Sequence, residues 1–247
     1  METGGKTVYG ATLGILMLET QFPRIHGDIG NARTWPFPVQ YRVVRGATPE
    51  QAVRGDPVSL AAPFIAAGRD LIASGCDGIA TNCGFLVPLQ NRMAEALGVP
   101  VASSSLMQVP LVQRMLPPGR QVGIVTISAA TLTEQHLAAA GIADDTPIVG
   151  TDEGEEFSRK ILSDQREIDF ERARADVVAA SVRLAQDKPD VGAIVLECTN
   201  MVPYARDVRR ATGRPVFSIY SYLTWFHAAL MPRKFDLELD DPAMPRL

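Results

Sequence analysis

Short, continuous apolar runs recur along this chain, and longer segments with helical spacing separate them. Apolar runs without alternation are typical of parallel strands that helices cover on both faces. The pattern predicts six such strands, at Thr12–Leu18, Gly78–Thr81, Val99–Ser103, Gln121–Ile127, Gly192–Leu196 and Val216–Tyr220. Glu19 follows the first run where a signal peptide would have small residues, so a buried strand is the favoured interpretation.

Three of the segments between these runs carry apolar residues at helical spacing. They are Ala61–Ser74, Val87–Leu97 and Ile168–Gln186. Strands that alternate with helices in this way indicate an α/β fold with parallel sheets.

One block of sequence occurs twice. Cys76–Ser103 aligns with Val191–Ser218 without a gap, at a shift of 115 residues. The alignment pairs Cys83 with Cys198, and it also pairs Val87/Val202, Pro88/Pro203, Gly98/Gly213, Pro100/Pro215 and Val101/Val216. Any two strand–helix–strand units share part of this pattern, but the paired cysteines favour a duplication.

The duplication predicts two pseudo-symmetric α/β lobes, each a parallel sheet flanked by helices, with the active site in the cleft between them. We place residues 1–107 together with 221–247 in the first lobe and residues 108–220 in the second. The segment after Ser221 is predicted to form an amphipathic helix that packs back on the first lobe.

Cys83 and Cys198 each follow a predicted strand, at the carboxyl end where open parallel sheets bind ligands. Two thiols that face one cleft from opposite lobes can act as an acid–base pair: one removes a proton from carbon while the other delivers one. Cys76 aligns with Val191 in the repeat, so a structural role is favoured for it.

The residues beside the two cysteines can bind a carboxylate and stabilise a carbanion through side-chain and backbone donors. Asn82, Gly84 and Phe85 flank the first thiol, and Thr199 and Asn200 follow the second. Glu197 is awkward, since a carboxylate next to a thiol raises the thiol pKa; its role stays open.

Two further candidates lie outside the cysteine motifs. Ser128 can bind a substrate carboxylate or cap a helix, and Thr131 has a capping-box spacing with Glu134. Arg24 and Arg33 lie in the long loop Thr20–Pro38, and either can recognise a second carboxylate, although that loop is equally compatible with a solvated surface or a subunit contact. His136 falls in a predicted helix and is expected to be exposed.

The motifs Thr81-Asn82-Cys83-Gly84 and Glu197-Cys198-Thr199-Asn200 resemble those of the aspartate/glutamate/hydantoin racemase superfamily. The resemblance extends to about Leu230. It implies a cofactor-independent racemase or epimerase with two pseudo-symmetric lobes, in which Cys83 and Cys198 are the catalytic pair.

This chain departs from the amino-acid racemases of that family at both motifs. Gly84 and Phe85 follow Cys83 where Asn-Thr is usual, and Asn200 stands where a histidine is usual. A glutamate racemase for cell-wall supply is therefore disfavoured, and an aspartate-, hydantoin- or unusual-acid racemase is expected. Alternatives on the same scaffold are a maleate-type cis–trans isomerase and a malonate-type decarboxylase. A non-catalytic small-acid-binding protein is the alternative from another class.

Composition narrows the partners. The chain has 247 residues, with 24 Lys+Arg against 28 Asp+Glu, so no basic excess favours nucleic acid or an anionic membrane. Three cysteines do not make a disulfide framework and favour a reducing, cytoplasmic setting. No phosphate-binding or metal-ligand spacing is present, so we expect no cofactor and a small carboxylate as substrate. The sequence is compatible with a homo-oligomer but does not fix the oligomeric state.

Overall fold

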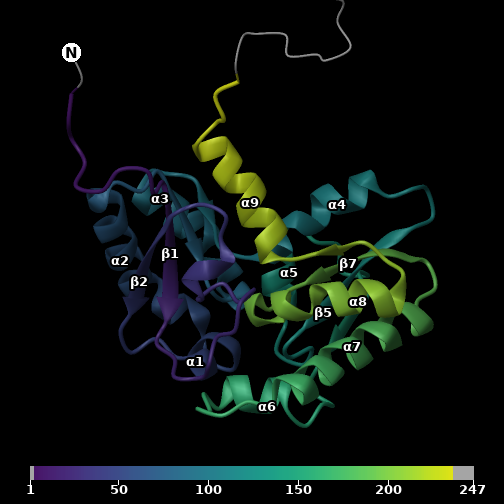
Figure 1. The fold of residues 1–247 in the computed structure, drawn as a ribbon. Coiled ribbons are helices and arrows are strands. Elements are labelled where there is room, and N and C mark those ends of the chain that lie inside the picture. Colours follow the sequence, from purple (N-terminus) through teal and green to yellow (C-terminus); the bar gives the residue numbers. More distant parts are fainter. Residues whose placement is uncertain (1–2, 236–247) are drawn as a thin grey trace, which may run out of the picture.

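The computed structural model describes residues 3–235, so the part of the predicted first lobe at 236–247 lies outside the described residues. Two four-stranded parallel sheets form the framework (Figure 1). The first has the order β2-β1-β3-β4 and the second the order β6-β5-β7-β8. The strands are β1 (Leu13–Leu18), β2 (Val39–Val44), β3 (Gly78–Thr81), β4 (Val101–Ala102), β5 (Gln121–Thr126), β6 (Ile148–Gly150), β7 (Val191–Leu196) and β8 (Val216–Phe217).

The predicted α/β class is confirmed, and all six predicted strands are present. β2 and β6 are strands that the apolar pattern missed. Both lie at a sheet edge; β2 is largely half-buried or exposed and contains Gln40 and Arg42, and β6 has three residues. A strand that buries little surface leaves only a weak apolar signal.

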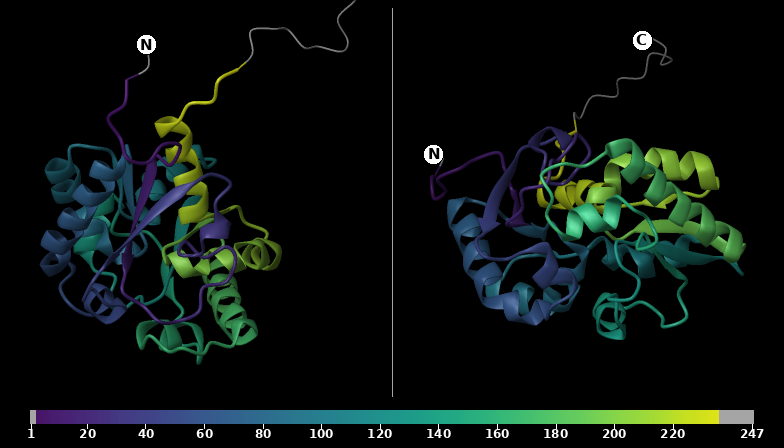
Figure 2. Two further views of the ribbon diagram at one scale, coloured as in Figure 1. Left: turned by 60° about the vertical axis from the view of Figure 1, so that its left-hand side comes forward. Right: turned by 90° about the horizontal axis from the view of Figure 1, so that it is seen from below.

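Helices surround each sheet, as Figure 2 shows from two further sides. The first half contributes α1 (Pro49–Val53), α2 (Ala61–Ser74) and α3 (Gln90–Leu97), with the 3-10 helices η1 (Ala32–Thr34), η2 (Pro57–Leu60) and η3 (Gly84–Leu89). The second half contributes α5 (Glu134–Ala140), α6 (Phe157–Leu162), α7 (Phe170–Asp187), α8 (Ala205–Thr212) and the 3-10 helix η5 (Thr199–Tyr204). None of the helices described is long and apolar enough to cross a membrane.

The repeated block has a structural reason for its shared glycine and proline. Gly98 ends α3 and Gly213 ends α8, and each has a positive φ (66° and 70°) that a side chain disfavours. Pro88 and Pro203 lie inside η3 and η5, so the predicted helix at Val87–Leu97 is a 3-10 turn followed by α3. The two halves therefore use the same local backbone plan.

The chain passes between the lobes twice. It leaves β4 and reaches the second lobe through η4 (Ser105–Gln108) and α4 (Val109–Met115), where Leu106 and Val112 join the core around β5 and β7. It returns after β8 through α9 (Ile219–Leu230), and Leu223 and Phe226 pack on β1. Figure 1 shows α9 lying between the two sheets.

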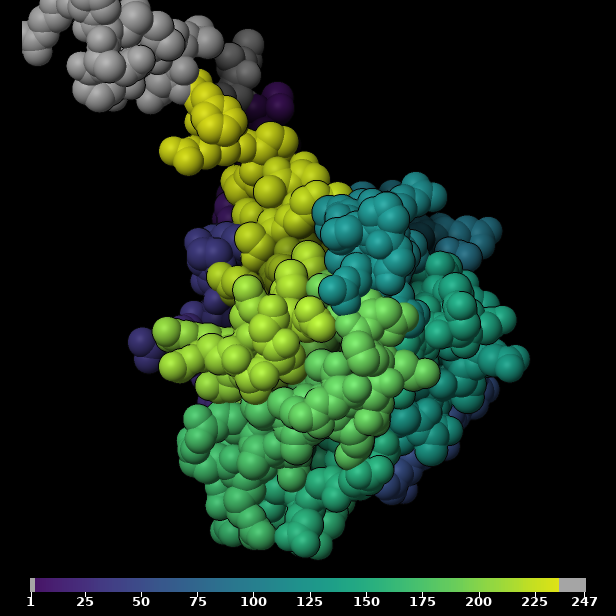
Figure 3. All heavy atoms as spheres, turned by 90° about the vertical axis from the view of Figure 1, so that its right-hand side faces the viewer, coloured from purple at the N-terminus to yellow at the C-terminus, as the bar shows by residue number. Residues whose placement is uncertain are grey.

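The outer side of α9 lies beside α4 on one face of the molecule (Figure 3). Large apolar side chains are exposed there, with Leu111 at 52%, Met115 at 58% and Trp225 at 60%. They border a shallow groove between the two helices.

Candidate active site

The two thiols lie at equivalent places in the two lobes. Cys83 follows β3 and is the N-cap of η3, and Cys198 follows β7 and is the N-cap of η5. Both line one small cavity, whose free space of about 350 Å³ includes the solvent at its mouth. The two cysteines thus lie at one shared cavity, as the sequence predicts.

The cavity wall is mostly apolar and comes from both lobes. Its apolar side chains, apart from the cysteines, are Leu18, Phe22, Pro49, Val53, Phe85, Ile127, Ile161 and Leu162. Among the described residues that line it, Arg24 is the one cation and Glu197 the one carboxyl. A partly open, largely apolar cavity with few polar groups is typical of a small-molecule site.

Burial dominates the electrostatics of both thiols. Burial, and next to it the nearby Glu197 carboxylate, raises the pKa of Cys83 to about 12, although the backbone N–H of Phe85 acts in the opposite direction. Burial, and next to it the Glu197 charge, also raises the pKa of Cys198 well above its ordinary value, while the backbone N–H of Asn200 opposes this. Each thiol thus faces the amide two residues farther along the chain.

Glu197 is 1% exposed and lies across from the first cysteine loop. Its Oε2 accepts hydrogen bonds from the Thr126 hydroxyl at 2.8 Å and from the Ile127 amide at 3.4 Å. Its Oε1 is directed at the Cα of Gly84, at a place that a β-carbon would occupy. Burial raises the pKa of Glu197 to about 7, so the carboxyl holds its proton far more readily than an exposed glutamate.

Hydrogen bonds across the cleft hold the two cysteine loops together. The Thr199 hydroxyl donates to the Asn82 carbonyl at 2.6 Å, and the Asn82 side chain accepts from the Leu18 amide at 2.7 Å. Ser105 donates to the carbonyls of Leu196 and Glu197 at 2.7 and 2.9 Å. The loops are therefore fixed by buried contacts rather than by solvent-exposed ones.

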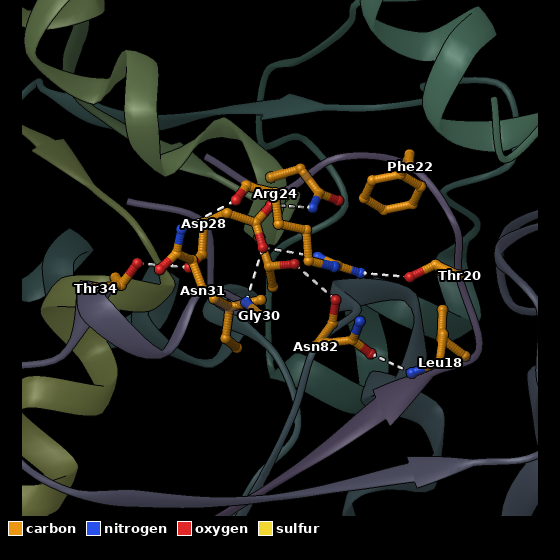
Figure 4. A network of polar contacts seen from close by, with 12 residues as sticks. Leu18, Thr20, Phe22, Arg24, Asp28, Gly30, Asn31, Thr34 and Asn82 are labelled. Atoms are coloured by element: carbon orange, nitrogen blue, oxygen red, sulfur yellow. Dashed lines mark hydrogen bonds and ion pairs between the residues drawn. The ribbon is translucent and has the colours of Figure 1, made fainter. Parts of the chain in front are cut away.

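A polar network from the loop at residues 19–38 reaches the second thiol, and Figure 4 shows the part of it around Arg24 and Asp28. Arg24 donates to Asp28 at 2.7 Å and to Thr20 at 3.0 Å, and its guanidinium lies over the Phe22 ring. Asp28 accepts from the Asn200 side chain at 2.5 Å, and the Asn200 Oδ1 lies 3.5 Å from the Cys198 sulfur. The loop thus connects a cation at the cavity wall to Cys198.

The second lobe also contacts the same loop, at the edge of the cavity. Asp164 accepts hydrogen bonds from the backbone amides of Gln21 and Phe22, at 2.6 and 3.2 Å. Asp164 itself has φ 50°, an uncommon conformation for a residue with a side chain. A broader open depression of about 1380 Å³ adjoins the cavity and shares Leu18, Thr20 and Arg24 with it.

The structure gathers most of the predicted site residues. Arg24, Asn82, Gly84, Phe85 and Asn200 line the cavity with the two cysteines. Two predicted substrate ligands do not line it.

Thr199 is used in the contact with Asn82, and Ser128 is buried with its amide near the Thr126 hydroxyl. His136 is 5% exposed, not exposed as expected. Its ring packs edge-on against Phe85, and it pairs with Thr133 as a capping box in place of the predicted Thr131–Glu134 pair.

Sequence reasoning missed Asp28 and left Glu197 without a role. Asp28 was one polar residue among many in its loop, and no spacing linked it to Asn200, 172 positions away. Over residues 3–235 the structure holds no group of three His, Cys, Asp or Glu side chains suited to a metal ion.

Comparison with protein families gives one match, to the Asp/Glu/Hydantoin racemase model, over residues 47–226. Solved structures share the fold at low sequence identity. A sulfate-associated mutant of arylmalonate decarboxylase is 19% identical with a TM-score of 0.61, covering 92% of this chain and 96% of that one. The aspartate racemase of Picrophilus torridus is 14% identical with a TM-score of 0.52, covering 90% and 93%.

Curated relatives carry a different name. A protein of Durusdinium sp. clade D named dimethylsulfoniopropionate lyase is 28% identical over 219 residues, which are 84% of this chain and 71% of that protein. Dimethylsulfoniopropionate lyases 7 and 3 of Emiliania huxleyi (strain CCMP1516) are 30% and 31% identical over 236 residues, 89% of this chain. The chain spans 67% and 60% of those two proteins.

Proposed function

Because this chain belongs to the Asp/Glu/hydantoin racemase family, we propose that it is a cofactor-independent enzyme in which a cysteine removes the proton α to the carboxylate of a small acid. The observation that carries the proposal is the single small cavity that contains both thiols and Arg24. Arg24 anchors the carboxylate; two of its N–H donors are used by Asp28 and Thr20, and a guanidinium has others to offer.

Among reactions that begin with this proton abstraction, we propose β-elimination from a carboxylate that carries a cationic leaving group, as in dimethylsulfoniopropionate. The charges at the cavity support a zwitterion: one cation faces one buried carboxyl. A dicarboxylate such as aspartate or glutamate would bring a second negative charge toward Glu197, where the cavity offers no second cation. The named activity of the curated relatives agrees with this choice.

A cationic substrate would also lower the high pKa of the Cys83 thiol. With a pKa of about 12, the Cys83 thiol is almost fully protonated near neutral pH and is therefore a poor base. A positive charge placed within a few ångströms of a thiol favours the thiolate. The Glu197 carboxylate, whose charge raises the pKa of Cys83, is a nearby proton acceptor.

The elimination balances without a further reactant. The Cys83 thiolate takes the α-proton, and the electron pair of that C–H bond forms the double bond between the α- and β-carbons. The bond from the β-carbon to sulfur breaks, and its pair leaves on neutral dimethyl sulfide; acrylate remains. Hydrogen bonds to the carboxylate stabilise the negative charge that develops during abstraction.

Racemisation or epimerisation of an α-substituted acid is the second candidate. It is favoured by the second thiol in the same cavity, because inversion needs a proton donor on the face opposite the base. Both reactions share the first step, so they differ only in the fate of the carbanion.

The test is proton NMR in D2O with dimethylsulfoniopropionate and, in separate samples, with single enantiomers of amino acids, hydantoins and an arylmalonate. We expect acrylate and dimethyl sulfide from the first sample, without an added cofactor. Inversion of an amino acid or hydantoin, with no acrylate formed, would instead assign the racemase reaction.

Cys76→Ser is the matched control, since Cys76 is a buried cysteine that does not line the cavity. It should retain activity, whereas Cys83→Ser should not. Inactivity of the folded wild-type protein on every substrate would contradict the proposal.

A further inference from the structure

Asn200 stands between a buried carboxylate and a buried thiol. Its Nδ2 lies 2.5 Å from Asp28 Oδ2, and its Oδ1 lies 3.5 Å from the Cys198 sulfur. Asp28 is 4% exposed and is itself held by Arg24 and by the Gly30 amide, at 2.7 and 2.8 Å. The amide of Asn200 therefore has little freedom to choose its partners.

The chemistry of these groups fixes which way the amide points. An ionised carboxylate only accepts hydrogen bonds, so the NH2 group of Asn200 must face Asp28. The carbonyl oxygen then faces Cys198, and it can only accept. A protonated thiol satisfies that oxygen by donating S–H, whereas a thiolate would meet a lone pair with a negative charge.

The first thiol has no such acceptor from the corresponding position. The repeat pairs Asn200 with Phe85, so an apolar ring stands where the second loop has an amide. The backbone amides of Phe85 and Asn200 act on their thiols in the same way. The charged and titratable groups that act on Cys198 are Glu197, Cys83 and Asp28, and every one of them disfavours a thiolate there.

We propose that Asp28, acting through the side-chain amide of Asn200, keeps Cys198 protonated, and that this leaves Cys83 as the base and Cys198 as a hydrogen-bond donor in the cavity. Asp28 and Asn200 are then positioning residues. The inference rests on the proposed function, in which Cys83 removes the α-proton and Cys198 lines the same cavity. It fixes the roles of the two thiols, since they cannot exchange while the Asp28–Asn200 contact is intact.

The test measures the pH at which each thiol becomes reactive toward iodoacetamide. Cys198 is followed in a Cys76→Ser/Cys83→Ser background, and Cys83 in a Cys76→Ser/Cys198→Ser background. We expect the midpoint of Cys198 to lie above that of Cys83. Asp28→Asn offers Asn200 an acceptor and a donor, so the Asn200 amide can turn its NH2 toward Cys198, and the Cys198 midpoint should fall by one unit or more.

Two variants control for the loss of a buried charge and for loosening of the loop. Asp28→Glu keeps an acceptor facing Asn200 and should restore the wild-type midpoint. Asp164→Asn weakens the contact to the amides of Gln21 and Phe22 without touching Asn200, and it should leave the Cys198 midpoint in place.

Circular dichroism establishes that each variant is folded, and the wild-type order of the two midpoints tests the proposal even if Asp28→Asn does not fold. A Cys198 midpoint at or below that of Cys83, or one that Asp28→Asn leaves unmoved, would overturn it. Alkylation needs no substrate. A shifted midpoint in a protein that turns over nothing would refute the proposed function alone, and an unmoved midpoint in an active enzyme would refute only this inference.

Discussion

Residues 82–85 and 197–200 occupy corresponding places in the two lobes, after β3 and after β7. Both loops put a thiol at the start of a 3-10 helix and direct a backbone amide at it. Apart from the cysteine, their residues differ at every position: Asn82, Gly84 and Phe85 correspond to Glu197, Thr199 and Asn200. The duplication has kept the backbone that presents the thiols, while the side chains give each thiol its own surroundings.

The differences are complementary across the cleft. Gly84 leaves room for the Glu197 carboxyl, and Thr199 supplies the hydroxyl that Asn82 accepts. The side chains of each loop therefore fit the loop opposite. Two related halves can thus form one asymmetric site.

The largest effect should come from replacing the two thiols in turn. Cys83→Ser removes the base, and a serine hydroxyl is a far weaker acid than a thiol, so turnover should fall about a thousandfold or more. Cys198→Ser keeps a hydrogen-bond donor at that place and changes only its position and strength, so it should cost less, about 10- to 100-fold. Acrylate formation measured for both variants checks the order. Equal losses of activity in the two variants would contradict the proposed difference between the thiols and would favour the racemase reaction.

Glu197→Gln should change how stability depends on pH. Burial raises the pKa of Glu197 from 4.5 in the unfolded chain to about 7 in the folded protein. The protonated carboxyl therefore contributes its full stabilisation below the unfolded-state pKa, and this stabilisation is lost as the pH rises through the folded-state pKa. The wild-type protein should lose up to about 3 kcal/mol between pH 5 and 8 from this group. A glutamine side chain does not ionise, so the variant should not show that loss.

Urea unfolding of both proteins at pH 5 and pH 8 measures the difference. Asn82→Asp, at the corresponding place in the first loop, shows whether any carboxyl beside a thiol has the same effect. The same pH dependence in wild type and Glu197→Gln would contradict the buried, shifted carboxyl.

The sequence predicted some parts of the fold and of the site and missed others, for physical reasons. The apolar runs predicted the central strands because buried parallel strands have no polar face, and the register of Cys83 with Cys198 predicted their meeting. The edge strand β2 was missed because, of its residues, only Val44 is buried. Asp28 could not be found, since it acts through a contact with Asn200 that only the folded chain creates. His136 was misjudged because its helix packs on η3 of the other lobe.

Gly84→Ala should be costly although the residue has an ordinary φ. A β-carbon would collide with the Glu197 carboxyl and would lie 2.8 Å from its backbone oxygen, which cannot move away as a flexible side chain can. Overpacking of this kind costs about 1–3 kcal/mol. Urea unfolding gives the value, and Gly84→Ala combined with Glu197→Ala should recover part of it. No recovery would mean that the two residues are not coupled.

Thr199→Val should have the smallest effect of the four. The variant keeps the shape of the side chain but loses the 2.6 Å hydrogen bond to Asn82 and leaves a buried carbonyl without that donor, at a cost of about 1–2 kcal/mol. Thermal unfolding gives the value. Thr212→Val is a matched control, because the Thr212 hydroxyl donates to a carbonyl within its own helix. A smaller loss for Thr199→Val than for this control would argue against a stabilising contact across the cleft.

The double passage of the chain between the lobes has a mechanical consequence. The outgoing crossing at Ser103–Ser105 and the returning crossing at Ser218 are tied by Gln108, which donates to the Ser218 carbonyl at 3.0 Å and accepts from Ser221 at 3.1 Å. Because the two crossings are joined at one place, sliding and twisting of one lobe against the other are restrained there. Asp164 adds a separate contact between the lobes, through the amides of Gln21 and Phe22.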